Sequence, residues 1–225
     1  MFRRTLFVVP FVVVYSLLAF TVLMGANIGL AALNARVTPA VPWFILPGAL
    51  LLLVAALAAE RSVGIGLKNR LAAPFPLVVA IGLAVATLGT AICIAEGSLY
   101  GMTHAAELGP PGTSELFQLG YALWLPVVAA VAAELCFRGL MQTGLHALMS
   151  PWAAITLTAA INTAAHRWGP DLAQQWLGYF VLLVGFGYLR WWTRSLAPAL
   201  VAHTLMNLFV SAALYIWGPA RWVLS

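Results

Sequence analysis

Residues 5–33 read TLFVVPFVVVYSLLAFTVLMGANIGLAAL and contain no charged side chain. A helix needs about 20 consecutive apolar residues to cross the hydrocarbon core of a bilayer, so this stretch is long enough to span one. Arg3 and Arg4 precede it, as in a secretory signal, but the run is far longer than the roughly 7–15 apolar residues of a signal peptide. We therefore expect Thr5–Leu33 to be a retained first membrane span.

Further apolar runs follow this stretch along the whole chain. They are Val41–Ala59, Leu71–Ala95, Leu116–Met149, Trp152–Ala165, Leu172–Leu189 and Ser195–Trp217. The run from Leu116 is long enough to tilt or kink, with Pro126 as the expected kink point. The sequence therefore predicts an all-α polytopic membrane helix bundle of about seven transmembrane helices. It would form a single integral membrane domain over residues 1–225, with three helices in residues 1–95.

The composition of the chain agrees with this prediction. It is 63% hydrophobic and 8% charged, whereas soluble domains carry about 25% charged residues. An ordinary soluble protein, a disordered chain and a nucleic-acid-binding protein built on basic patches are thereby excluded. The net charge of +5 reflects Lys and Arg that flank spans. Cys93 and Cys136 are too few for a disulfide framework.

Lys and Arg residues also predict the orientation, because they gather in the cytoplasmic loops of membrane proteins. With the N-terminus in the cytoplasm, the inside residues are Arg3, Arg4, Arg61, Lys68, Arg70, Arg190 and Arg194. Arg36, Arg167 and Arg221 are then outside, and Arg138 lies within a span. We expect a multi-pass protein of the bacterial inner (cell) membrane with a cytoplasmic N-terminus.

Polar residues inside the predicted spans are the candidates for function. An ionisable residue there costs roughly 2.5–3.5 kcal/mol on insertion scales, so it is a functional-site hypothesis by default. Three pairs at i, i+4 spacing each share one helix face. They are Glu134 with Arg138, Asn162 with His166, and His203 with Asn207.

The depth and chemistry of these pairs suit activation of a water molecule. At about 1.5 Å per residue, Glu134, His166, His203 and Asn207 lie roughly 12–22 Å from the cytoplasmic span ends. A carboxylate, imidazoles and a carboxamide supply a base, a proton carrier and oxyanion donors. Each pair alone has a structural alternative, namely a buried ion pair, interhelical hydrogen bonds or an interfacial histidine. The three pairs together favour a catalytic site.

At these residues the sequence resembles the CAAX-protease and bacteriocin-processing (CPBP) family of intramembrane proteases, which includes the type II CAAX prenyl endopeptidases. That family carries Glu-Glu-x-x-x-Arg, Phe-x-x-x-His and His-x-x-x-Asn or Asp motifs on successive membrane helices. The corresponding segments here are Ala133-Glu134-Leu135-Cys136-Phe137-Arg138, Asn162-Thr163-Ala164-Ala165-His166 and His203-Thr204-Leu205-Met206-Asn207. The resemblance covers a CPBP-like catalytic core over roughly residues 116–215.

The resemblance implies a role for each of these positions. A Glu at position 133, together with His166, would activate the water, and His203 with Asn207 would stabilise the oxyanion or hold the water. Glu134 and Arg138 would brace the helix and set the local field. The resemblance favours a mechanism without metal or other cofactor. Zinc, which takes three protein ligands and a water, is the less favoured alternative.

The sequence departs from the family pattern at two positions. Asn162 stands where the family usually has Phe, and Ala133 stands where it has the first Glu. Because a methyl group cannot accept a proton, three interpretations of Ala133 are open. Position 133 carries a deliberate Glu→Ala substitution, which we favour because every other catalytic position is intact; or the natural site is degenerate; or Glu134 acts alone.

We expect a glutamate-type intramembrane endopeptidase that cleaves membrane-associated or C-terminal anchor segments of proteins and is impaired by Ala133. A narrower alternative is a protease that processes C-terminal sorting signals. An alternative from another class is a non-catalytic membrane scaffold or immunity protein that retains a relic site. A small transporter is disfavoured, because the sequence shows no inverted repeat and no matching pair of broken helices. The expected partners are a membrane-embedded or membrane-anchored protein substrate and the lipid bilayer, and no nucleic acid.

Overall fold

The computed structural model describes residues 2–69, 71–95, 112–166 and 176–222, with side chains described for 8–69, 71–89, 91, 112–165 and 176–209. All regular secondary structure within these ranges is helical. The elements are α1 (Phe2–Val37), α2 (Ile45–Val63), α3 (Phe75–Ala95), α5 (Glu115–Ala133), η1 (Glu134–Met141), α6 (Gln142–His146), α7 (Pro151–His166), α8 (Trp176–Thr193) and α9 (Ala197–Trp222).

These elements confirm the predicted helix bundle. Since α5, η1 and α6 follow one another without a break, the described segments form seven continuous rods, one for each predicted span. Three helical stretches are long and apolar enough to cross a membrane, judged by length and composition: Val8–Val37, Ile45–Val63 and Glu115–His146. Phe75–Gly89 and Ala197–Phe209 are shorter apolar helical stretches. The chain is therefore an integral membrane helix bundle.

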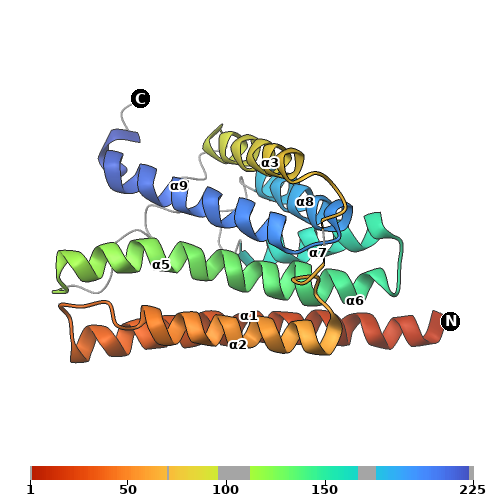
Figure 1. Ribbon diagram of the computed structural model, residues 1–225, viewed down its shortest axis with the longest axis horizontal. Coiled ribbons are helices and arrows are strands. Elements are labelled where there is room, and N and C mark those ends of the chain that lie inside the picture. Colours follow the sequence, from red (N-terminus) through yellow and green to blue (C-terminus); the bar gives the residue numbers. More distant parts are fainter. Residues whose placement is uncertain (1, 70, 96–111, 167–175, 223–225) are drawn as a thin grey trace.

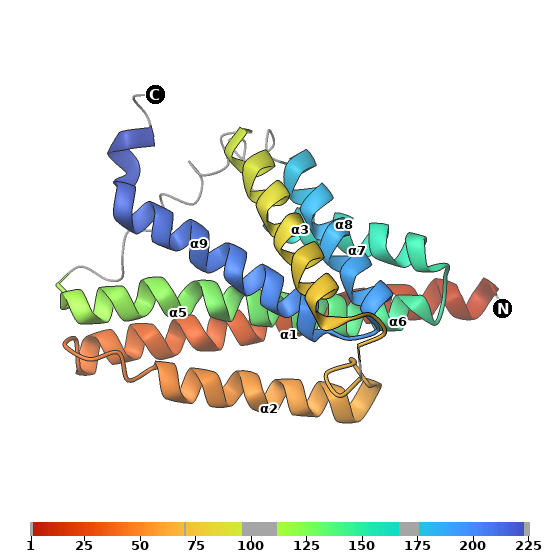
Figure 2. The same ribbon diagram turned by 45° about the horizontal axis from the view of Figure 1, so that its top comes forward.

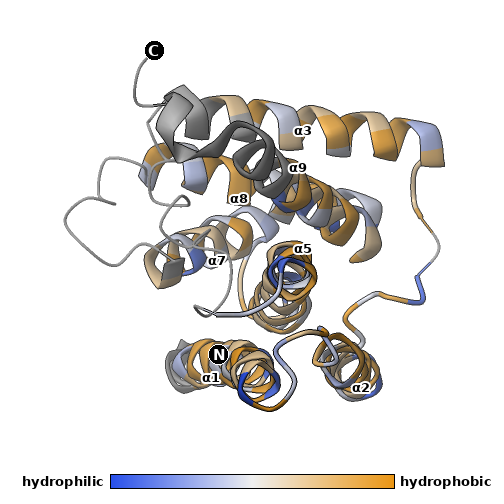
Figure 3. Cartoon of the chain, turned by 90° about the vertical axis from the view of Figure 1, so that its left-hand side faces the viewer, coloured by the Kyte–Doolittle hydropathy of each residue, from blue (hydrophilic) through white to orange (hydrophobic). Residues whose placement is uncertain are grey.

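The outer faces of the helices are apolar, as lipid contact requires. Phe11 on α1, Leu46 on α2 and Phe75 at the start of α3 are 70%, 67% and 68% exposed. Figure 3 shows hydrophobic residues over most of α2 and α3. Exposed apolar surface of this extent is rare on soluble monomers and is typical of a surface that contacts another protein or a membrane. Here this surface contacts the hydrocarbon of the bilayer.

The rod α5–η1–α6 is the central post of the bundle. In Figure 1, α1 and α2 lie on one side of it, and α3, α8 and α9 lie on the other. Figure 2 shows α9 crossing α5 obliquely. Buried apolar residues on both sides of the post hold the layers together. One cluster joins Leu23, Leu52 and Val128 of α1, α2 and α5, and another joins Val78, Leu182 and Ala202 of α3, α8 and α9.

The connection between α2 and α3 fixes the start of α9. Gly64 ends α2 with a left-handed backbone (φ 65°), and its N–H donates to Glu60 O, which is the common glycine ending of a helix. Beyond it, the Leu196 N–H donates to Gly66 O over 3.2 Å, and the Ala72 N–H donates to Thr193 O over 3.1 Å. These bonds clamp the turn before α9 and so set where α9 meets the central post.

The central post departs from α-helical geometry over Glu134–Met141. This segment, η1, is a π-helix, and the Gln142 N–H that follows donates to Phe137 O, five residues back. The sequence does not predict this widening; the expected kink point was Pro126, which lies inside α5. Wide turns of this kind are rare and occur frequently at functional sites.

Candidate active site

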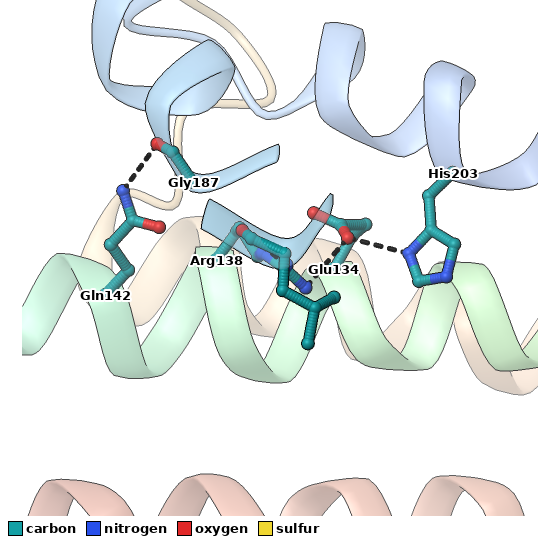
Figure 4. Close-up of polar contacts among 6 residues, drawn as sticks. Glu134, Arg138, Gln142, Gly187 and His203 are labelled. Carbon is teal, nitrogen blue, oxygen red and sulfur yellow. Dashed lines mark hydrogen bonds and ion pairs between the residues drawn. The ribbon is translucent and has the colours of Figure 1, made fainter. Parts of the chain in front are cut away.

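Glu134 is the centre of the buried polar cluster. Its carboxylate is completely buried, and its Oε1 atom lies 2.8 Å from His203 Nδ1 and 3.0 Å from Arg138 Nη1. Figure 4 shows this oxygen between the guanidinium and the imidazole. The structure therefore brings together residues of η1 and α9 that are far apart in the sequence.

Arg138 offsets the burial of this carboxylate and is itself held by α8. Its side chain is 1% exposed, and Nη2 donates a hydrogen bond to Leu183 O over 3.0 Å. The guanidinium carbon also lies 5.7 Å from the centroid of the Phe186 ring, within the range of a cation–π contact. These contacts compensate only part of the cost of burying the pair, because Glu134 Oε2 and Arg138 Nε have no hydrogen-bond partner among the described residues.

Helix α8 forms the back wall of the cluster, and the sequence analysis assigned it no role. The Phe186 ring stacks on the His203 imidazole with centroids 5.0 Å apart and an interplanar angle of 19°. One residue further, Gly187 O accepts a hydrogen bond from Gln142 Nε2 over 2.9 Å (Figure 4). Because α8 contributes carbonyl groups and one ring, no ionisable residue marked it. The only signal was the i, i+3, i+4 spacing of Leu183, Phe186 and Gly187 on one face.

Ala133 lies in a different environment from its neighbour Glu134. Its side chain is completely buried in an apolar cluster with Phe137, and Ile161 and Ala165 of α7 pack against the same cluster. Consecutive helical residues point about 100° apart, so position 133 points into this apolar cluster, which residues of both α1 and α7 line, while Glu134 contacts His203 of α9. A carboxylate at 133 would enter an apolar environment beside the end of α7.

The second motif is placed by its backbone. His166 is the last residue of α7, and its side chain lies outside the described part of the structure. Asn162, one turn earlier on the same helix, is completely buried. The expected grouping of His166 with His203 around one water therefore stays a prediction.

Asn207 contacts the central post at its proline. Its Nδ2 atom donates a hydrogen bond to Pro126 O over 3.1 Å, which ties α9 to α5 one turn beyond His203. A carboxamide nitrogen carries two hydrogens, so one donor remains for another acceptor. The structure thus places Asn207 on the same helix as His203 but away from the Glu134 carboxylate contacts.

The described side chains include no group of three or more His, Cys, Asp or Glu that could hold a metal ion. Glu134 and His203 supply two ligand types in contact. A zinc site requires three protein ligands, so it would need a further ligand such as His166. The zinc alternative thus depends on an imidazole outside the described residues.

Comparison with known proteins places the polar cluster within one family. Residues 115–209 match the family described as Type II CAAX prenyl endopeptidase Rce1-like. The match begins at the first residue of α5 and extends into α9, so it contains every polar residue described above. The chain matches no curated protein and no solved structure. The resemblance inferred from the three motifs is confirmed.

Proposed function

Residues 115–209 match the type II CAAX prenyl endopeptidase Rce1-like family, and from this match we propose that the chain is an intramembrane endopeptidase that cleaves membrane-associated or C-terminal anchor segments of proteins. The family supports a CAAX-type protease in general. The finer substrate class follows from the apolar exterior, because a substrate that reaches a site between membrane helices must itself be embedded or anchored in the membrane.

The observation that carries this proposal is the buried contact of Glu134 with Arg138 and His203. Three ionisable groups from two helices meet where the side chains are 0%, 1% and 4% exposed. Burying such groups is costly, and membrane proteins keep them mainly where they act on ions, protons or substrates. Helices that needed only to pack together would be served as well by apolar residues.

We propose a glutamate-type mechanism for the intact site. A Glu at position 133 and His166 would activate the water, and His203 with Asn207 would stabilise the tetrahedral oxyanion or hold the water. The position of Ala133 supports this division, because Ala133 lies in a buried apolar cluster against which Ala165 of α7, the residue before His166, also packs. With Ala133 the chain lacks that carboxylate. We therefore propose that it cleaves its substrate slowly.

We further propose that the protein lies in the bacterial inner membrane with a cytoplasmic N-terminus. The support is the excess of Lys and Arg on the side of the α2–α3 and α8–α9 connections, where Arg61, Lys68, Arg190 and Arg194 lie. The narrower role of processing C-terminal sorting signals remains a version of the same proposal. Ala133 favours one other candidate, a non-catalytic membrane scaffold or immunity protein with a relic site.

A cleavage assay separates the protease from the scaffold. The Ala133→Glu chain, reconstituted in liposomes, is offered peptides that carry a C-terminal membrane anchor, and the same peptides without the anchor. We expect mass spectrometry to show cuts near the anchor in the anchored peptides only, with no effect of chelators. A folded Ala133→Glu chain that cuts no peptide of the panel would favour the scaffold instead.

A further inference from the structure

The imidazole of His203 is held at one of its two nitrogens. Nδ1 lies 2.8 Å from Glu134 Oε1, and Arg138 Nη1 lies 3.0 Å from the same oxygen. A carboxylate paired with arginine accepts hydrogen bonds and donates none, so Nδ1 is the nitrogen that carries the hydrogen. Nε2 then keeps its lone pair. It makes no hydrogen bond within the part of the chain that the structure describes.

The ring is also fixed in direction. Phe186 stacks on one face of the imidazole at 5.0 Å, and Leu183 O on the same face of α8 holds Arg138. Helix α8 therefore positions both the imidazole and the arginine that pairs with Glu134. A carboxylate that orients an imidazole through Nδ1, leaving Nε2 to accept a proton, is the arrangement found in hydrolytic triads.

Within the described residues, no other carboxylate competes for this role. The Glu60 carboxylate accepts the N–H groups of Gly66 and Leu67 over 2.9 and 3.1 Å, and Glu115 lies in the first turn of α5. Position 133 carries only a methyl group. The chain has six acidic residues, and among the described ones only Glu134 lies in the buried core. Its Oε1 atom contacts Arg138 Nη1 and His203 Nδ1.

We propose that, in the chain as it stands, His203 is the general base and accepts the proton of the attacking water at Nε2, with Glu134 and Phe186 as positioning residues. This inference rests on the proposed endopeptidase function. It assigns the general base for the slow cleavage that we propose for the chain with Ala133. It differs from the role implied by the resemblance, in which His203 stabilises the oxyanion or holds the water.

The proposed step balances without a further reactant. The water oxygen bonds to the carbonyl carbon of the scissile peptide, its proton moves to His203 Nε2, and the carbonyl π pair moves onto oxygen. Glu134 stabilises the resulting imidazolium. When the tetrahedral intermediate collapses, the C–N bond breaks and Nε2 returns the proton to the leaving amine. The products are a carboxylic acid and an amine.

The test measures the single-turnover cleavage rate of variants of the present chain in liposomes. The substrate is an anchored peptide that the Ala133→Glu chain cuts. We expect His203→Ala to lower the residual rate by about 10²–10⁴-fold, the usual contribution of a general base. Leu205→Ala is the matched control, because Leu205 lies on the same helix and is 46% exposed. Its rate should equal that of the parent.

Three results would overturn the inference. One is residual cleavage that survives His203→Ala. Another is residual cleavage that is lost in His166→Ala and kept in His203→Ala. The third is that the chain with Ala133 shows no cleavage while the Ala133→Glu chain is active. This result would overturn the inference but leave the proposed function intact. If neither chain cuts any anchored peptide, the proposed function fails together with the inference.

A spectroscopic measurement tests the positioning role without activity. In a chain with ¹⁵N-labelled histidine, the His203 signals, assigned by their loss in His203→Gln, should be those of the Nδ1–H tautomer when the ring is neutral. Glu134→Gln offers an amide that can also donate, so the Nε2–H tautomer should gain population. An Nε2–H tautomer in the parent chain would contradict the assignment.

Discussion

At the scale of single residues, the neighbours Ala133 and Glu134 divide the site into two halves. Ala133 lies in an apolar cluster lined by α1 and α7, whereas Glu134 contacts Arg138 and His203. The sequence could predict that the two side chains diverge, because consecutive helical residues point about 100° apart. It could not predict which half meets α9, because that depends on how the helix is rotated within the bundle.

Removal of Arg138 tests how much the Glu134–Arg138–His203 cluster contributes to the free energy of unfolding. In Arg138→Met, Glu134 loses the cation 3.0 Å from its Oε1 atom, and breaking a buried pair in this way costs about 3–5 kcal/mol. We expect that loss in the free energy of unfolding, measured in mixed micelles. The matched control Arg36→Met, at an exposed position near the end of α1, should lose far less. Equal losses in the two variants would show that the buried ion pair of Arg138 does not contribute to the free energy of unfolding.

The double variant Glu134→Gln with Arg138→Met refines this prediction. With the buried negative charge removed as well, no uncompensated ion remains in the core. The double variant should therefore unfold with a higher free energy than Arg138→Met alone. A double variant whose loss equals the sum of the two single losses would mean that the two charges act independently.

At the scale of elements, apolar runs predicted all seven rods, because a long apolar run has few structural alternatives. The predicted span Leu116–Met149 and the observed rod from Glu115 to His146 nearly coincide. The π-helix inside it and the role of α8 were not predicted. Both depend on backbone groups, namely the Phe137 carbonyl and the carbonyls of Leu183 and Gly187, which every sequence contains.

Gly187 tests how closely α8 must approach the central post. A Cβ atom at this position would lie 3.0 Å from Ile155 Cγ2 and 3.1 Å from Gln142 Oε1, so in Gly187→Ala these side chains must shift by a few tenths of an ångström. Overpacking of this kind costs typically about 1–3 kcal/mol. We expect Gly187→Ala to lower the free energy of unfolding and the cleavage rate of an Ala133→Glu background.

The control for this variant is Gly29→Ala on α1, where nothing lies within 4 Å of the added Cβ. Alanine is the better helix former by about 0.8–1.0 kcal/mol in helix interiors, so Gly29→Ala should be neutral or stabilising. If both variants behaved alike, the close approach of α8 at Gly187 would not matter.

At the scale of the whole molecule, the predicted orientation can be tested across α2. Lys68 and Ala40 are exposed and lie beyond opposite ends of this helix, whose 19 residues span about 28 Å at 1.5 Å per residue. In a Cys93→Ser background, Lys68→Cys should react with a membrane-impermeant thiol reagent only from the cytoplasmic side, and Ala40→Cys only from the outside. Cys136 should stay unreactive because it is buried. Labelling of both positions from one side would contradict the orientation.

The central claim, that this bundle is an endopeptidase whose water-activating position is residue 133, is tested most directly by comparing Ala133→Glu with Ala133→Gln. Both side chains have similar size and enter the same apolar cluster beside Phe137, so they differ mainly in the ability to accept a proton. We predict that Ala133→Glu cleaves an anchored substrate about 10²–10⁴-fold faster than the parent, the range of general-base catalysis, and that Ala133→Gln gives no gain. Equal rates for the two variants, with both folded as the parent, would contradict the claim.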